Sequence, residues 1–104
     1  MLTKRTAIKT AKQFLAQCNK LPIKIDRAIL FGSMVKGKVN DESDIDLALF
    51  SEQFTDNILT NLDLIGPINI HYPDIDVHTY PSDYYLQKDL MMEEIRKTGI
   101  EITV

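Results

Sequence analysis

The chain has 104 residues, of which 44% are apolar and 26% charged, as in a soluble single domain with one modest hydrophobic core. The formal net charge of −3 disfavours a protein that grips long nucleic acid through many phosphate contacts. No apolar run approaches the roughly 20 residues of a membrane span, and residues 1–14 lack the apolar centre of a signal peptide, so we expect a cytoplasmic protein without a membrane partner.

The first third of the sequence predicts a helix, a strand and a short second helix. Apolar residues at spacings of three and four indicate an amphipathic helix over residues 3–18. Residues 23–31 predict a strand, because alternating residues lead into a continuous apolar run. Gly32-Ser33 interrupts this strand, and a short helix is expected to begin there and to end near Gly37, before a polar loop over residues 38–43.

A second strand is predicted over residues 44–50. Its alternation puts Ile45 and Leu47 on one face and Asp44 and Asp46 on the other. Acidic residues form strands poorly and are costly to bury without a positive partner, so the pair calls for an explanation beyond packing.

A third helix and a third strand follow. Thr55 or Asp56 is predicted to cap the helix, and Gly66-Pro67 to end it. Residues 74–80 predict a third strand. Its alternation places Asp74, Asp76 and His78 on one face and Ile75 and Val77 on the other.

The last predicted elements are a helix that starts at Pro81-Ser82 and ends at Gly99, and a short strand over residues 100–104. Met91 and Met92 lie on this helix and cannot both face one core, which makes a partner surface plausible there. Some of the connections are too short for crossovers. We therefore expect an α/β (α+β) fold: one domain over residues 1–104, with helices packed on a mixed sheet of about four strands.

The acidic residues of the predicted strands favour a metal site. Asp44 and Asp46 project side by side, about 7 Å apart, because residues two apart share a face of a strand. If the strand over residues 74–80 is adjacent, Asp76 joins them, and three converging carboxylates would repel one another unless a cation such as Mg²⁺ binds. The alternative for the pair by itself is a solvent-facing polar edge.

Gly32-Ser33 follows a buried strand and opens a helix, a position where free backbone N–H groups bind phosphate. Gly32 lets a phosphate approach closely, the Ser33 hydroxyl adds a hydrogen bond, and Lys36 adds a positive charge one turn later. The alternative is an ordinary strand-to-helix turn with a serine cap.

Together these features resemble a family signature. Gly32-Ser33, ten residues and then Asp44-Ile45-Asp46 resemble the Gly-Ser-x10-Asp-x-Asp motif of the nucleotidyltransferase superfamily typified by DNA polymerase beta. The chain most resembles the minimal nucleotidyltransferases of bacteria and archaea. Gly37 and Ser43 fit the usual flanks of the motif, whereas Met34 departs from it, since many relatives carry a polar or basic residue there.

The resemblance implies a nucleotidyltransferase fold and the transfer of AMP from ATP, with release of pyrophosphate. Asp44 and Asp46 would hold two Mg²⁺ ions, and Asp76 would bind the catalytic ion and help to activate the acceptor hydroxyl. Asp74 is a rival for this third position, although it follows Pro73 at the edge of its strand.

The same resemblance assigns the nucleotide's phosphates to the glycine turn. Gly32 and Ser33 would hold the β- and γ-phosphates, and Lys36 would assist them.

The resemblance also suggests the acceptor. Minimal nucleotidyltransferases are often paired with a HEPN ribonuclease toxin and act as its antitoxin by adding AMP to a toxin tyrosine. Two alternatives remain: a non-catalytic module that regulates a toxin by contact, and a transferase that acts on a small molecule such as an aminoglycoside.

Histidines and tyrosines give weaker signals. His71 and His78 are more readily explained as structural residues than as metal ligands, although His78 shares a face with Asp76 and could border a nucleotide pocket. The four tyrosines are expected in the core or at an interface rather than in a base-stacking platform.

Overall fold

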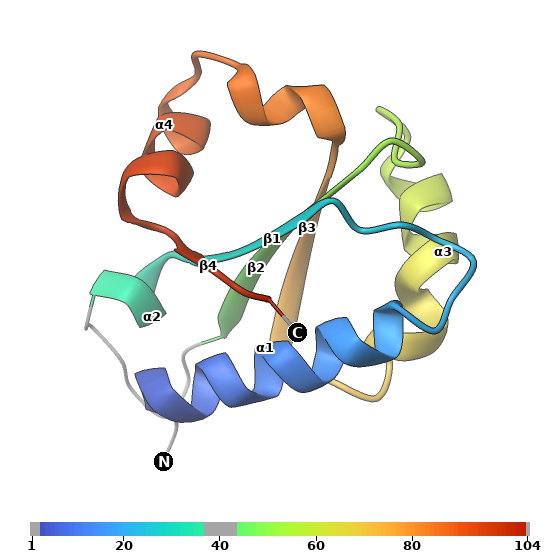
Figure 1. Cartoon of the computed structure of the whole chain (residues 1–104), viewed down its shortest axis with the longest axis horizontal. Coiled ribbons are helices and arrows are strands. Elements are labelled where there is room, and N and C mark those ends of the chain that lie inside the picture. Colours follow the sequence, from blue (N-terminus) through green and yellow to red (C-terminus); the bar gives the residue numbers. More distant parts are fainter. Residues whose placement is uncertain (1–2, 37–43, 104) are drawn as a thin grey trace.

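The computed structural model describes residues 3–36 and 44–103 (Figure 1). The predicted helix end near Gly37 and the predicted loop over residues 38–43, with the flanking Ser43, lie outside the described residues. In the described part of the chain, no helix is both long enough and apolar enough to cross a membrane.

Four strands form a mixed sheet in the order β3-β2-β1-β4. β1 (Arg27–Phe31) pairs antiparallel with β2 (Ile45–Ser51) and with β4 (Ile100–Glu101), whereas β3 (Ile75–Pro81) pairs in parallel with β2. The prediction of a mixed sheet of about four strands with helices packed on it is confirmed.

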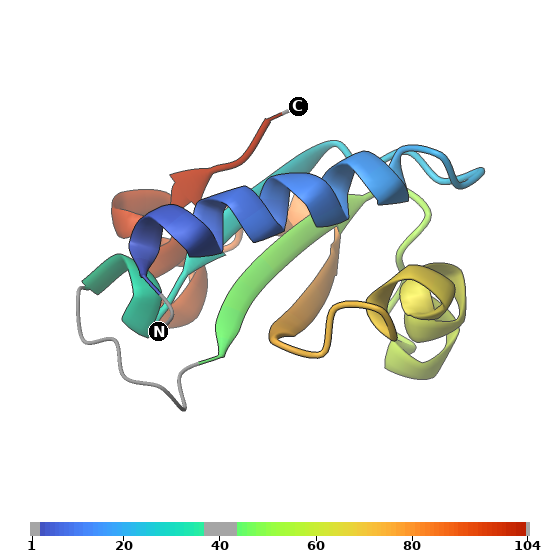
Figure 2. The same ribbon diagram turned by 90° about the horizontal axis from the view of Figure 1, so that it is seen from below.

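Helices cover both faces of this sheet (Figure 1). α1 (Lys4–Cys18) and α3 (Ile58–Asn69) lie on one face, and Figure 2 shows α1 crossing the sheet. The 3₁₀-helix η1 (Ser82–Leu86) and α4 (Leu90–Thr98) lie on the other. The sheet is thus the middle layer, with a separate hydrophobic cluster on each side.

The alternation of β2 assigns its residues to the two clusters. Ile45 and Leu47 pack in the α1 and α3 cluster, whereas Ala48 and Phe50 pack in the η1 and α4 cluster. Asp46 shares the second face, but lies at the start of the strand, where it is only partly buried.

The first strand is shorter than predicted, since it begins at Arg27 rather than at residue 23. Ile23 is buried, so its apolar character serves the core without a strand. The N–H of Lys24 donates to the side-chain oxygen of Gln53 at 2.8 Å, which satisfies the backbone outside the sheet. The apolar pattern in the sequence therefore begins at residue 23, before the hydrogen-bonded strand begins at Arg27.

The prediction for α3 was wrong at both ends. Its N-cap is Asn57, whose side chain accepts from the N–H of Thr60 at 3.2 Å, and not Thr55 or Asp56. Pro67 lies inside the helix. Proline removes one backbone donor, and in the last turn this loss leaves the preceding hydrogen bonds intact.

The last predicted helix is in fact two helices. η1 ends at Leu86, and Asp89 caps α4 by accepting the N–H of Met92 at 2.7 Å. The break changes the buried face: Met92 is fully buried, whereas Leu86 and Leu90 are exposed. The expectation that the two methionines cannot share one core is confirmed, because Met91 is exposed.

Candidate active site

Three chain segments meet at one end of the sheet. β1 runs antiparallel to β2, so its last residue, Phe31, pairs with Asp46 near the start of β2. β3 runs parallel to β2, and Asp76 near its start pairs with the same Asp46. This register brings the Gly32 turn and the two aspartates together, although they are up to 44 residues apart in the sequence.

Asp46, Asp76 and His78 form a cluster on the face of the sheet that also carries η1 and α4. Nε2 of His78 lies 3.4 Å from Oδ1 of Asp46 and 3.5 Å from Oδ2 of Asp76. One ligand atom from each of the three lies within 4.8 Å of the others. The ring of Phe31 packs edge-on against His78, with ring centroids 5.0 Å apart, and so limits the positions that the imidazole can take.

Asp44 and Asp74 precede their strands and are exposed. Among the described residues, the group that could share one ion comprises Asp46, Asp76 and His78, so neither Asp44 nor Asp74 belongs to it. The carbonyl of Asp74 accepts the N–H of Ile45 at 2.8 Å, which gives this residue a place in the backbone pairing of the sheet. Of the two rivals for the third acidic position, the structure brings Asp76 to Asp46.

The electrostatics of the cluster favour a bound cation. Burial raises the pKa of Asp46, the charges of Asp76 and Asp44 raise it further, and the hydrogen bond and charge of His78 oppose these effects. A carboxylate in this position is therefore stabilised by positive charge. The donor set fits a divalent cation held by carboxylate oxygens, as Mg²⁺ prefers, with the imidazole available as a hydrogen-bonding neighbour.

Gly32 is required beside this acid for two reasons. Its φ of +81° lies in the left-handed region, which disfavours side chains. A Cβ at this position would also collide with Oδ2 of Asp46 and lie 3.3 Å from its Cγ. The absence of a side chain leaves the backbone of the turn directly against the carboxylate.

α2 (Ser33–Lys36) begins immediately after this glycine. The carbonyl of Gly32 accepts from the N–H groups of Val35 at 3.1 Å and Lys36 at 3.2 Å. The N–H groups that precede them at the start of the helix have no helical acceptor. Ser33 therefore stands where a phosphate oxygen would find both backbone donors and a hydroxyl. The side chain of Met34 lies outside what the structure describes.

Lys36, the predicted phosphate ligand, has a partner in this structure. Its Nζ forms an ion pair with Oε1 of Glu94 on α4, and both side chains are partly exposed. No local sequence pattern indicates this pair, because the two residues lie 58 positions apart. The ion pair keeps the positive charge of Lys36 beside α2 and anchors α2 to α4.

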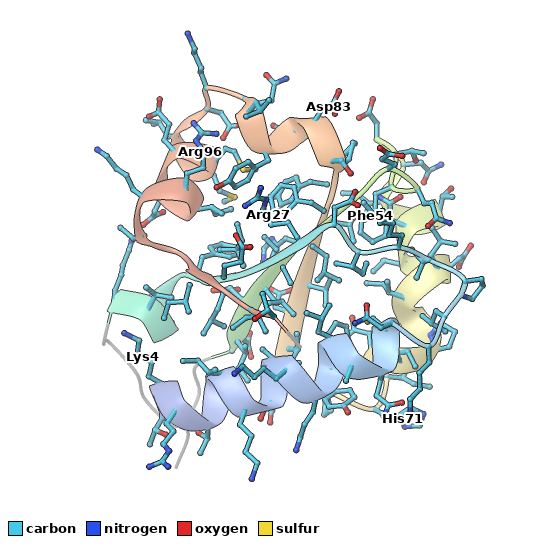
Figure 3. All side chains as sticks on the ribbon, in the orientation of Figure 1. Lys4, Arg27, Phe54, His71, Asp83 and Arg96 are labelled. Atoms are coloured by element: carbon cyan, nitrogen blue, oxygen red, sulfur yellow. The ribbon has the colours of Figure 1, made fainter. Side chains whose placement is uncertain are left out.

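The four tyrosines, which were expected in the core or at an interface, are partly buried and pack against the two hydrophobic clusters. Tyr72 packs on Phe14 in the α1 cluster. Tyr80 stacks between Phe50 and Tyr84, at centroid distances of 5.3 and 5.2 Å, in the second cluster. His71 lies on the turn after α3, at the periphery of the molecule (Figure 3).

Comparisons with known proteins identify a matching family model and a similar fold. The model of the family described as "Polymerase beta, Nucleotidyltransferase" matches residues 9–103. The fold is similar to the crystal structure, at 1.40 Å, of a Sulfolobus solfataricus protein described as a candidate nucleotidyltransferase, with a TM-score of 0.70 and 16% identity over 94% of this chain and 80% of that chain. A search of curated proteins found no match.

Proposed function

Because this chain belongs to the polymerase beta nucleotidyltransferase family, we propose that it transfers AMP from ATP to a hydroxyl group of a partner protein. The observation that carries the proposal is the register of β2 and β3, which puts Asp46 beside Asp76 and next to the Gly32 turn. A carboxylate cluster adjoining an open backbone turn is what a metal-bound triphosphate needs.

In the proposed reaction, the acceptor oxygen forms a bond to the α-phosphorus of ATP. The bond from that phosphorus to the bridging oxygen of the β-phosphate breaks, and pyrophosphate leaves. Asp76 accepts the hydroxyl proton, because its side chain is 57% exposed against 27% for Asp46 and is therefore more accessible to an acceptor. His78 holds both carboxylates in place through its contacts with them.

Asp46 and Asp76 would hold one Mg²⁺ ion, and Asp44, which lies outside their group in this structure, would join Asp46 in holding a second ion when the nucleotide is bound. These ions would neutralise charge on the triphosphate and on the departing pyrophosphate. Gly32 and Ser33 bind the β- and γ-phosphates, and Lys36 joins them by exchanging Glu94 for a phosphate oxygen.

We further propose that the acceptor is a tyrosine of a partner HEPN toxin, so that the chain acts as an antitoxin. This proposal follows from the resemblance to minimal nucleotidyltransferases. Transfer to a small molecule such as an aminoglycoside is the alternative reaction, and inhibition by contact alone is the alternative without catalysis.

The test combines Mg-ATP, this protein and a candidate partner, and reads the partner's intact mass. A gain equal to AMP residues, abolished by Asp46→Asn and by Asp76→Asn, is the expected result. Asp63→Asn on α3 is the matched control, since it removes an exposed carboxylate outside the cluster. Protection of cells by the Asp46→Asn, Asp76→Asn double variant at the level of the unaltered protein would refute catalysis and favour a contact inhibitor.

A further inference from the structure

β3 is an edge strand of the sheet, and its free edge lies beside the candidate active site. We propose that the acceptor protein binds as an extended, basic segment along this edge, with one apolar side chain in the groove between α3 and β3. The inference rests on the proposed function, because it names the route by which a protein acceptor reaches Asp76.

The register of the sheet determines which backbone groups are free. The N–H of Ile45 donates to the carbonyl of Asp74, so the even-numbered residues of β3 direct their backbone groups toward β2. The N–H and C=O groups of Val77 and Thr79 therefore point away from the sheet. An added strand would pair with these groups.

A groove runs along this edge. Its lining comes from two residues of α3 and four consecutive residues of β3: Ile58, Leu62, Val77, His78, Thr79 and Tyr80. The side chain of Ile58 is 65% exposed, so the groove has an apolar wall open to solvent. His78 also lines the groove, although its side chain contacts the two aspartates on the opposite face of the sheet from α3. Because β3 is the edge strand, a segment paired along it borders both the groove and the site.

The edge itself is held in place by a buried side chain. Asn61 of α3 is fully buried, and its Nδ2 donates to Oγ1 of Thr79 at 3.0 Å. The same amide is bonded to both backbone groups of Thr55, at 2.9 and 2.8 Å. α3 and β3 are thereby fixed relative to each other, which gives the groove a constant width for an incoming segment.

Charge decides the chemistry of the occupant. Residues 44–87 contain eight acidic side chains and neither lysine nor arginine, and the acids are Asp44, Asp46, Glu52, Asp56, Asp63, Asp74, Asp76 and Asp83. Figure 3 shows Asp83 near the C-terminal end of β3. The segment 44–87 supplies every lining residue of the groove and both aspartates of the cluster, so the docking edge attracts a basic segment and repels nucleic acid.

The same argument opposes a second copy of this chain as the occupant. In a symmetric dimer formed through this edge, the acidic segment 44–87 of each copy would face that of the other, so that acid would meet acid across the twofold axis.

The test uses the amidated, acetylated peptide KVKYKVK and its acidic counterpart EVEYEVE, each titrated into the labelled full chain without metal or nucleotide. We expect the basic peptide to move the amide resonances of Val77 and Thr79 and the acidic peptide to leave them in place. Raising the salt from about 50 to about 500 mM should weaken the binding, because the attraction is partly between exposed charges.

Two substitutions on one turn of α3 separate the groove from the general charge. Ile58→Gln should lower the affinity for the basic peptide about fivefold, because it removes an apolar contact. Leu59→Gln is the matched control, since Leu59 is 75% exposed but does not line the groove, and it should bind as the unaltered protein does.

Equal binding of both peptides, shifts away from this edge, or equal effects of the two variants would overturn the inference. So would resonances of Val77 and Thr79 that move with protein concentration alone, since these would identify a second copy as the occupant. Calorimetric titration with Mg-ATP tests the proposed function separately. If Mg-ATP does not bind while the basic peptide still shifts Val77 and Thr79, nucleotide transfer is refuted and the docking edge is retained.

Discussion

The backbone of Gly32 lies against the carboxylate of Asp46, so that a Cβ on Gly32 would collide with Oδ2 of Asp46. The two residues come from different segments, a turn after β1 and the start of β2, which the pairing of Phe31 with Asp46 brings together. The contact joins the proposed phosphate site to the proposed metal site. Any side chain at position 32 would therefore disturb both sites at once.

Gly32→Ala should abolish or strongly weaken the binding of Mg-ATP and lower the stability of the protein. The added methyl group must displace Asp46, and the left-handed backbone costs an alanine roughly 1–2 kcal/mol. Isothermal titration and chemical denaturation measure the two effects. Gly66→Ala is the control, because a Cβ there meets no atom within 4 Å and alanine favours the helix. Unchanged Mg-ATP affinity in Gly32→Ala would contradict the assigned cradle.

Asp46→Asn should raise the melting temperature of the metal-free protein at pH 7. The folded state raises the pKa of Asp46 above its ordinary value, chiefly by burial. Stability is therefore lost as the pH rises from about 4 through the folded pKa, since the unfolded chain ionises this group more readily. The variant avoids this loss, so its advantage should vanish below about pH 4. Thermal melts in EDTA across this range measure it.

Saturating Mg-ATP should reverse that order, because only the unaltered protein gains stability from binding at Asp46. Asp63→Asn, outside the cluster, should match the unaltered protein under both conditions. A metal-free Asp46→Asn variant that melts lower at pH 7 would show that the carboxylate is satisfied without a cation.

Glu94→Gln should tighten Mg-ATP binding about two- to fivefold. The substitution releases Lys36 from an ion pair whose side chains are partly exposed, and exposed pairs contribute about 1 kcal/mol or less. The cost of exchanging Glu94 for phosphate disappears in the variant. Glu93→Gln removes the same charge from an adjacent, exposed position and should have a smaller effect. Equal affinity changes in the two variants would mean that the field of α4, and not the ion pair, acts on the nucleotide.

Asn61→Ala should destabilise the fold by about 2 kcal/mol, because it removes a buried amide that bonds both backbone groups of Thr55 and the hydroxyl of Thr79. Urea denaturation measures this loss. Thr60→Ala, at the adjacent exposed position of α3, should change stability far less. A loss for Asn61→Ala no larger than that for Thr60→Ala would show that water replaces the amide and that the edge of β3 is not held by it.

Several helix boundaries were beyond the reach of local patterns. Gly66-Pro67 has the composition of a helix end, yet α3 continues through it, because the lost hydrogen bond falls in the last turn. The apolar pattern after Pro81 predicts one helix, whereas Asp89 interrupts it by capping α4 and by accepting the hydroxyl of Tyr84 at 2.7 Å. The ends of these helices depend on which backbone N–H and C=O groups find hydrogen-bond partners, and this cannot be predicted from local composition.

The sequence by itself determined the mixed sheet with its helices, and the Gly-Ser and Asp-x-Asp motif that places the chain in its family. Side-chain periodicity predicts the strands and helices, and the short spacing between Gly-Ser and Asp-x-Asp defines the motif. Only the tertiary structure showed that strand register places Asp76, which the sequence favoured over Asp74, beside Asp46. It also decided that His78 contacts both aspartates and that Lys36 pairs with Glu94. The physical reason is that these contacts follow from strand register and helix packing between distant segments, which no local pattern specifies.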